Sequence, residues 1–245
     1  MVSITSYLLM EIAQRNIKLI FCDLDHNPVS ELNPLYGHHR TSQRMLQQCK
    51  WNKQIKDFTW QQIIIQKINN QAKVLKINGS DEGYNILKQF ARDVKIGDVS
   101  NREGHAAKVY FNHLFGVEFS RSNDSTINHL LDYGYSILLS CFNKEIVAGG
   151  CATQLGIHHI NEYNQFNFAC DLMECFRPII DNYVVSNPVD ELDSSYKYEL
   201  INIFNQYYEF NYKNYTLKDI IHLYTQGMIS YLNDPKDKKV VKFQL

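Results

Sequence analysis

The stretch TINHLLDYGYSILLSCFNKEIVA, residues 126–148, is the longest apolar helical pattern in the chain and indicates the fold class. Its longest largely apolar run, from Tyr135 to Phe142, is eight residues and is followed by Asn143-Lys144-Glu145. That run is far shorter than the roughly 20 residues that a membrane-spanning helix needs. Within this helix we expect Tyr133-Gly134-Tyr135 to lie in the core, with the glycine allowing another helix to approach closely. The stretch therefore predicts a buried helix of a helical domain.

Helical periodicity continues on both sides of this stretch, so we predict a mainly α fold. A short α/β segment, residues 1–30, combines a helix over 4–13 with one strand over 17–22 that has no partner nearby. The helical domain follows as residues 31–245, and we expect its tail, 235–245, to be basic and mobile. The other predicted helices cover residues 40–52, 60–77, 82–93, 101–115, 168–185 with a kink at Pro178, 196–207 and 217–232.

Composition narrows the class of protein further. The chain has 245 residues, 44% of them hydrophobic, which suffices for a sizeable core. Its formal net charge of -1 excludes a strongly basic protein, so any nucleic-acid binding must use local patches. Six scattered cysteines without a CxxC motif indicate buried thiols in a reducing compartment. Together with the absence of a membrane-spanning run, these features favour a cytoplasmic location and no membrane partner.

Two polar clusters could carry chemistry. In Ser100-Asn101-Arg102-Glu103, Ser100 and Glu103 have the spacing of a helix capping box, which gives Glu103 a purely structural interpretation. The paired residues His158 and His159 follow Gly156, and imidazoles are the commonest ligands of transition metals. One histidine pair is weak evidence, because a loop with one buried and one exposed imidazole would look the same.

A third cluster places two carboxylates on an otherwise apolar helix. Asp171 and Glu174 stand three residues apart, so both lie on one face of that helix. Buried carboxylates are costly unless they are paired or bound to a cation, and Arg177 could serve as the partner. A set of carboxylates and imidazoles suits Mg²⁺ or Mn²⁺ bound with a phosphate substrate. Zn²⁺ is less favoured, because no thiolate stands near the histidines with finger spacing.

Four blocks in order along the chain resemble one family. They are FCDLDHNPVSELNPLYGHHR, NREGHAAKVYFNHLFG, NHLLDYGYSILLS and GIHHINEYNQFNFACDLMECFRP. The chain resembles the CRISPR-associated endonuclease and integrase that inserts new spacers into the array, in the branch that accompanies single-effector (type II) systems. The resemblance extends over nearly the whole chain.

The resemblance implies a metal site and a reaction. The metal ligands of the family fall on Glu103, His159 and Glu174, with Asp171 and His158 as possible assisting groups. The implied reaction joins the 3′-hydroxyl ends of a protospacer to the leader-repeat junction by transesterification, with Mg²⁺ or Mn²⁺ as cofactor. The implied partners are double-stranded DNA, a second copy of the chain in a homodimer, and the small second adaptation protein of the CRISPR system.

DNA contacts would come from basic residues around these motifs. Arg102, Lys108, Arg121 and Arg177 are the candidates for phosphate contacts, and each could equally be a solvated residue or a partner of the site carboxylates. The basic residues of the tail are more consistent with solvation than with DNA contact.

The chain also departs from the family pattern. Family members usually begin with a domain of several β-strands, of which residues 1–30 resemble only a remnant. A truncated product, a misplaced start codon and a natural short variant are all compatible with this. Two alternative functions therefore stay open: a non-catalytic DNA-binding or assembly remnant, and a transposon-encoded integrase relative.

Overall fold

The structure is a computed structural model that describes residues 3–15, 17, 19–24, 28–32, 39–236 and 238–245. Its helices, in chain order, are α1 (Ser6–Gln14), α2 (Thr41–Cys49), α3 (Lys53–Ile77), α4 (Asp81–Arg92), α5 (Arg102–Phe115), α6 (Thr126–Ala148), α7 (Asn167–Met173), α8 (Arg177–Ser186), α9 (Ser194–Asn202) and α10 (Leu217–Asn233). Three 3₁₀ turns are η1 (Ile96–Asp98), η2 (Glu174–Phe176) and η3 (Ile203–Asn205). The strands are β1 (Leu19–Cys22), β2 (Pro28–Leu32), β3 (Tyr207–Phe210) and β4 (Lys213–Thr216). The prediction of a mainly α fold with a short α/β segment at the N-terminus is confirmed.

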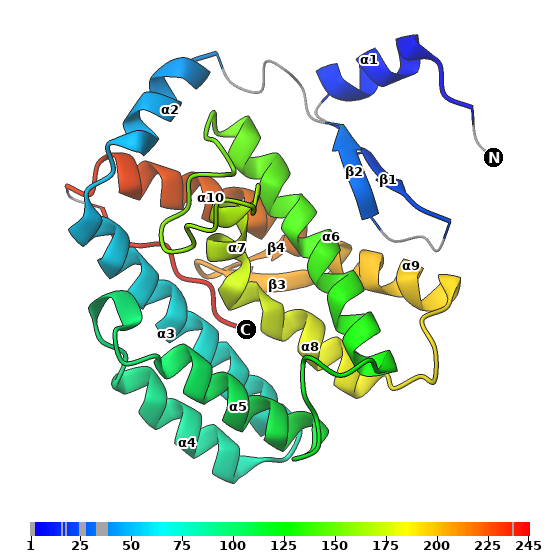
Figure 1. The fold of residues 1–245 in the computed structure, drawn as a ribbon, viewed down its shortest axis with the longest axis vertical. Coiled ribbons are helices and arrows are strands. Elements are labelled where there is room, and N and C mark those ends of the chain that lie inside the picture. The colour runs from blue at the N-terminus through cyan, green and yellow to red at the C-terminus, as the bar shows by residue number, and fades with distance from the viewer. Residues whose placement is uncertain (1–2, 16, 18, 25–27, 33–38, 237) are drawn as a thin grey trace.

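The helical body consists of two groups that share α3. On one side α3 packs with α4 and α5, and on the other side α6 packs with α7, α8 and α10 (Figure 1). The longest helices begin at side-chain caps, since Asn52 accepts a hydrogen bond at the start of α3 and Ser125 at the start of α6. Helix α3 touches η2 and α8, so it joins the two groups across the core. None of the described helices combines the length and apolar character required to cross a membrane.

The central helix α6 has the bounds expected from the sequence, and its interior confirms the reasons given. Tyr133 and Tyr135 are 7% and 8% exposed. A Cβ atom at Gly134 would come within 2.4 Å of Ile180 Cγ2, so the glycine is what allows α8 to pack against α6. The expected kink at Pro178 is also present, because the segment is divided into α7, η2 and α8 with Pro178 in the first turn of α8.

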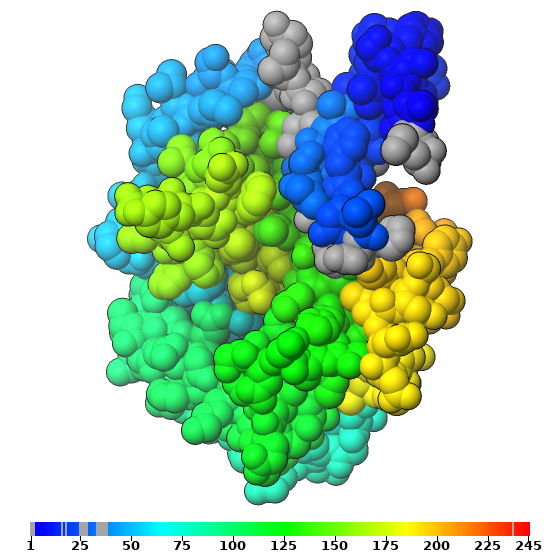
Figure 2. All heavy atoms as spheres, turned by 45° about the vertical axis from the view of Figure 1, so that its right-hand side comes forward, coloured from blue at the N-terminus to red at the C-terminus, as the bar shows by residue number. Residues whose placement is uncertain are grey.

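The strand predicted over 17–22 is not alone. It forms β1, which pairs antiparallel with β2 in a hairpin that aligns Leu19 with Leu32. The hairpin lies against α6, where the Ser140 hydroxyl donates a 2.7 Å hydrogen bond to Glu31. Helix α1 has no buried residue and stands out from the body (Figure 2). The sequence pattern missed β2, because PVSEL lacks the apolar content of a typical strand.

Two expectations for the C-terminal region are wrong. The helix expected over 196–207 ends at Asn202, and the following residues form the β3–β4 hairpin. The tail is not mobile over its last residues, since Val240 is 8% exposed and Phe243 is fully buried. The Phe243 ring stacks on Phe176 with 4.2 Å between ring centroids, and its backbone N–H donates a 2.7 Å hydrogen bond to Gln66. Tertiary packing thus orders a segment whose local sequence is polar.

The structure has all six cysteines as free thiols. Cys151 and Cys175 are buried as expected, whereas Cys22 and Cys49 are exposed. The expectation of burial is therefore wrong for these two, which stand at the ends of a short strand and of a surface helix.

Candidate metal and phosphoryl-transfer site

The N-terminus of α5 presents Glu103 to the core side of the helix. The cap is not the predicted box, because Ser100 makes no hydrogen bond through its buried hydroxyl. Asp98 instead accepts hydrogen bonds from the backbone N–H groups of Arg102 (2.9 Å) and Glu103 (3.0 Å), and Asn101 is the N-cap residue. The Glu103 carboxylate is therefore not used for capping and is available for another contact.

The turn η2 presents Glu174 from the opposite side. This residue stands where the helix is interrupted before Pro178, and it is 4% exposed. Arg177 donates to it across 3.0 Å, as the sequence interpretation anticipated. Burial alone would raise the pKa of Glu174, but Arg177 and Lys67 outweigh burial, and the net pKa lies below its ordinary value. Glu174 is therefore ionised at neutral pH.

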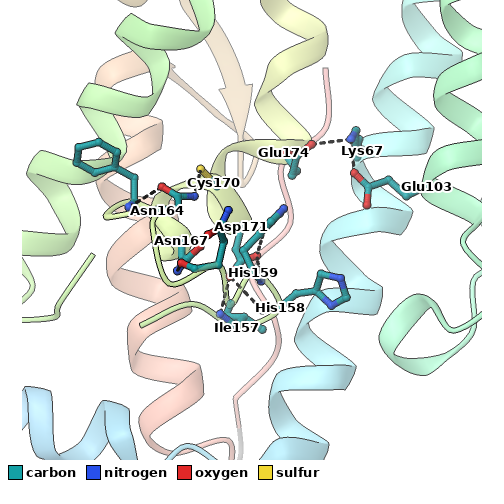
Figure 3. Close-up of polar contacts among 12 residues, drawn as sticks. Lys67, Glu103, Ile157, His158, His159, Asn164, Asn167, Cys170, Asp171 and Glu174 are labelled. Atoms are coloured by element: carbon teal, nitrogen blue, oxygen red, sulfur yellow. Dashed lines mark hydrogen bonds and ion pairs between the residues drawn. The ribbon is translucent and has the colours of Figure 1, made fainter. Parts of the chain in front are cut away.

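Lys67 of α3 joins the two carboxylates, and sequence reasoning missed it. Its Nζ atom lies 2.6 Å from Glu103 Oε1 and 2.5 Å from Glu174 Oε2 (Figure 3). Burial alone would lower the pKa of Lys67, but the attraction of both carboxylates outweighs it and the net pKa is raised. The signal was present in the sequence, because Lys67 falls on the apolar face of its helix between Ile63 and Ile68, where a cation requires a partner.

His159 is held in place by Asp171. The Asp171 carboxylate is fully buried and accepts hydrogen bonds from the backbone N–H groups of Ile157, His158 and His159. One of its oxygens also lies 2.6 Å from His159 Nδ1, and this contact raises the pKa of His159. Because Nδ1 faces Asp171, Nε2 is the ring nitrogen left for a ligand.

Gly156 and His158 complete this loop in different ways. A Cβ atom at Gly156 would lie 2.4 Å from the carbonyl oxygen of His159, so the tight turn requires glycine. The His158 ring is exposed on one face and stacks on the buried Trp60, with 4.3 Å between ring centroids. A cleft of about 360 Å³ opens beside His159, lined in part by Lys56.

The predicted metal ligands thus come together only in part. Glu103 and Glu174 meet through Lys67, and both lie near enough to His159 to influence its pKa. Among the described residues no three His, Cys, Asp or Glu side chains are already placed to hold a metal ion. Glu174 Oε2 nevertheless lies buried, and the group that it faces is the Lys67 ammonium at 2.5 Å. A buried carboxylate oxygen that already faces a cation fits a place for a metal ion.

The four residues considered for DNA phosphates lie in different environments. Arg177 stacks over Tyr135 and forms an ion pair with Glu174, so its charge neutralises a site carboxylate and is not directed at DNA. Arg121 pairs with Asp132, and Arg102 stacks over the ring of Phe90. Lys108 is exposed on α5, the helix that carries Glu103.

Comparison with known proteins identifies the family to which the chain is similar. The family model of the CRISPR-associated protein Cas1 matches residues 1–190. The chain is 35% identical over 182 residues to the CRISPR-associated endonuclease Cas1 of Neisseria meningitidis serogroup C (strain 8013), a match that covers 74% of this chain and 60% of that protein. It is 28% identical over 219 residues to a CRISPR-associated endonuclease Cas1 of Francisella tularensis subsp. novicida, covering 80% of this chain and 66% of that protein. The chain thus spans about two thirds or less of the length of these relatives.

Solved structures show the same fold at low sequence identity. A casposase bound to its integration product superposes with a TM-score of 0.75 at 19% identity, covering 96% of this chain and 77% of that one. A Cas6-RT-Cas1–Cas2 complex superposes with a TM-score of 0.74 at 19% identity, covering 98% of this chain and 31% of that one. The family match over residues 1–190 and the 35% identity to the Neisseria relative lead to one conclusion: the chain belongs to the Cas1 family of CRISPR-associated proteins.

Proposed function

We propose that this chain is a metal-dependent DNA endonuclease and integrase that acts in spacer acquisition. It joins the 3′-hydroxyl ends of a protospacer to the leader-repeat junction by transesterification. The observation that carries the proposal is the meeting of Glu103 and Glu174, from separate elements, beside an imidazole oriented by Asp171. Membership of the Cas1 family supports the same assignment.

The residues fit a hard divalent cation such as Mg²⁺ or Mn²⁺. Glu103, Glu174 and Nε2 of His159 would hold it, and Asp171 would keep the imidazole in the required orientation. When bound, the ion would polarise the phosphoryl oxygen and favour deprotonation of the attacking hydroxyl. The carboxylates must be ionised to bind it, so activity should fall at acid pH.

The surrounding residues have distinct parts in this proposal. Arg177 neutralises Glu174 and fixes its direction, while Lys108 is the exposed cation best placed for a DNA phosphate. Arg102 and Arg121 would contact DNA only by leaving Phe90 and Asp132. His158 would support the loop by stacking on Trp60 and would assist the site only indirectly.

The partners follow from the related assemblies. Structures of similar fold include a Cas1–Cas2 complex and a casposase bound to its integration product. They support DNA and the small second adaptation protein as partners of this chain. We propose in addition that the DNA is double-stranded and that the chain acts as a homodimer. The likeness to the casposase also keeps a transposon-encoded integrase as the second candidate function.

A strand-transfer assay tests the proposal. The chain, its small partner protein and Mn²⁺ are mixed with a labelled duplex bearing free 3′-hydroxyls and a supercoiled plasmid carrying a leader and repeat. We expect joining that is abolished by EDTA and by Glu174→Gln, and retained in Glu118→Gln, which changes an exposed carboxylate. Equal joining by Glu174→Gln would refute the site. A folded protein that binds DNA and never joins it would support the non-catalytic alternative, and joining without preference for the leader-repeat plasmid would favour the transposon-type enzyme.

A further inference from the structure

Among the contacts of the described residues, Lys67 is the one group that touches both carboxylates of the predicted metal site, Glu103 and Glu174. Its side chain is 10% exposed, and it comes from the middle of α3, which is packed on both sides. A lysine in such a place loses most of its hydration, and only close anions offset that cost. The contact is therefore built into the core and is not a surface ion pair.

The charges around Lys67 balance. Glu103 and Glu174 carry two negative charges, and Lys67 and Arg177 carry two positive charges within 3.0 Å of them. Without a counter-cation, two neighbouring carboxylates in this partly buried place would repel each other. Lys67 therefore allows the pair to assemble on folding, before any metal ion is present.

We propose that Lys67 is the resident counter-cation of the Glu103–Glu174 pair: it holds the two carboxylates together in the metal-free protein and competes with a divalent cation for the same oxygens. This inference rests on the metal site proposed above. A divalent cation held by Glu103 and Glu174 would compete with the ammonium that now lies between these two carboxylates. The flexible stem of Lys67 would let its ammonium move aside and stay nearby.

This arrangement links metal binding to the binding of an anion. The four side chains sum to zero charge, so a bound dication leaves the cluster with a net positive charge. A phosphodiester would then be attracted to the site mainly in the metal-loaded state. Lys67 thus lowers the affinity of the site for the metal ion, and it increases the attraction of the metal-loaded site for a DNA phosphate.

The first test compares Lys67→Met with wild type by isothermal titration with Mn²⁺. Removing the competing cation should tighten Mn²⁺ binding at least about tenfold. The matched control is Lys53→Met on the same helix, which removes a surface ion pair to Asp57 and should leave Mn²⁺ binding unchanged. Binding by Lys67→Met that is equal to or weaker than that of wild type would overturn the inference.

The second test needs no metal and covers the case in which Lys67→Met folds poorly. The free energy of unfolding is measured in EDTA for wild type, Lys67→Met, Glu103→Gln and the double variant. Lys67→Met should lower the free energy of unfolding by clearly less in the Glu103→Gln background than in wild type, because only the Glu174 carboxylate then needs a counter-cation. Additive losses would show that Lys67 does not hold the pair.

The two tests separate this inference from the proposed function. If wild type binds no Mn²⁺, or binds it as well after Glu174→Gln, the metal site is wrong, and competition by Lys67 falls with it. The comparison in EDTA would still decide whether Lys67 holds the carboxylates together.

Discussion

Asp171 shows how one buried side chain can prepare a site without binding the ligand itself. Its oxygens are taken by three backbone N–H groups and by His159 Nδ1, so it is better suited to orienting the histidine than to assisting as a ligand. Partners of this kind fix the ring nitrogen that a metal uses. The candidate role of Asp171 in the metal site is thus indirect.

Replacing Asp171 by Asn should weaken Mn²⁺ binding about 10- to 100-fold. The amide has a single acceptor oxygen, so it cannot both accept the hydrogen bonds of the loop N–H groups and orient the imidazole as the carboxylate does. Titration calorimetry measures this directly. Asp124→Asn is the matched control, since it removes an exposed aspartate that contacts His129 at the surface. Equal Mn²⁺ affinities for Asp171→Asn and wild type would contradict the orienting role.

Asp181 makes stability depend on pH. Burial raises its pKa to about 6, although Tyr135 and Tyr110 donate hydrogen bonds to it. Between about pH 4 and pH 6 Asp181 of the folded chain retains a proton that it has released in the unfolded chain, so its contribution to the free energy of unfolding falls as pH rises through this window. The total change is on the order of 3 kcal/mol, and it levels off above about pH 6.

Urea unfolding at several pH values tests this expectation. Asp181→Asn should flatten the decline, since the amide has no proton to lose. Asp190→Asn, which changes an exposed carboxyl, should leave the slope as in wild type. If the Asp181→Asn curve keeps the wild-type slope, another group causes the dependence.

At the scale of single elements, the start of α5 decides where Glu103 points. Asp98 has a left-handed backbone conformation, with φ of 49°, and its carboxylate accepts from the first N–H groups of the helix. Aspartate and asparagine tolerate that conformation better than most residues. The cap therefore comes from the 3₁₀ turn before the helix and leaves Glu103 free to meet Lys67.

Asp98→Asn should lower the free energy of unfolding by about 1 kcal/mol, because one acceptor and the charge favourable to the helix N-terminus are lost. Ser100→Ala should change it by less than about 0.5 kcal/mol, since that hydroxyl makes no hydrogen bond. Chemical unfolding of both variants distinguishes this cap from the box suggested by the sequence. A larger loss for Ser100→Ala would reverse the assignment.

At the scale of the whole molecule, the C-terminal tail ties α3 to the turn that carries Glu174. Asn70 donates a 2.8 Å hydrogen bond to the carbonyl of Cys175 and accepts one from the N–H of Leu245. Phe243 stacks on Phe176, two residues after Glu174. The last residues of the chain thus pack against α3 and η2, the two elements that carry Lys67 and Glu174.

Phe243→Ala should cost about 3–5 kcal/mol of stability, because it removes a fully buried ring and leaves a cavity beside η2. The free energy of unfolding in urea gives the value. Gln244→Ala alters an exposed neighbour in the same tail and should have little effect. Similar small losses for both would mean that the tail does not pack as the structure shows.

The sequence by itself determined the helical class, the bounds of α6, the close approach of another helix at Gly134 and the break near Pro178. These features depend on local periodicity, on glycine and on proline, whose effects act within a few residues. The candidate ligands Glu103, His159 and Glu174 were also named from the sequence, although their role as a metal site stays a prediction.

Only the tertiary structure decided the rest. Lys67 contacts Glu103, which is 36 residues away in the chain, and Glu174, which is 107 residues away. Hydrophobic periodicity describes neighbours within one helix or strand and cannot predict contacts of this kind. The same holds for β2, whose pairing with β1 overrides a weak local preference, and for the tail, whose order comes from burying Phe243. Asp98 and the N-cap residue Asn101, and not Ser100, accept from the first N–H groups of α5. Both have a left-handed backbone conformation, which the spacing of residues does not predict.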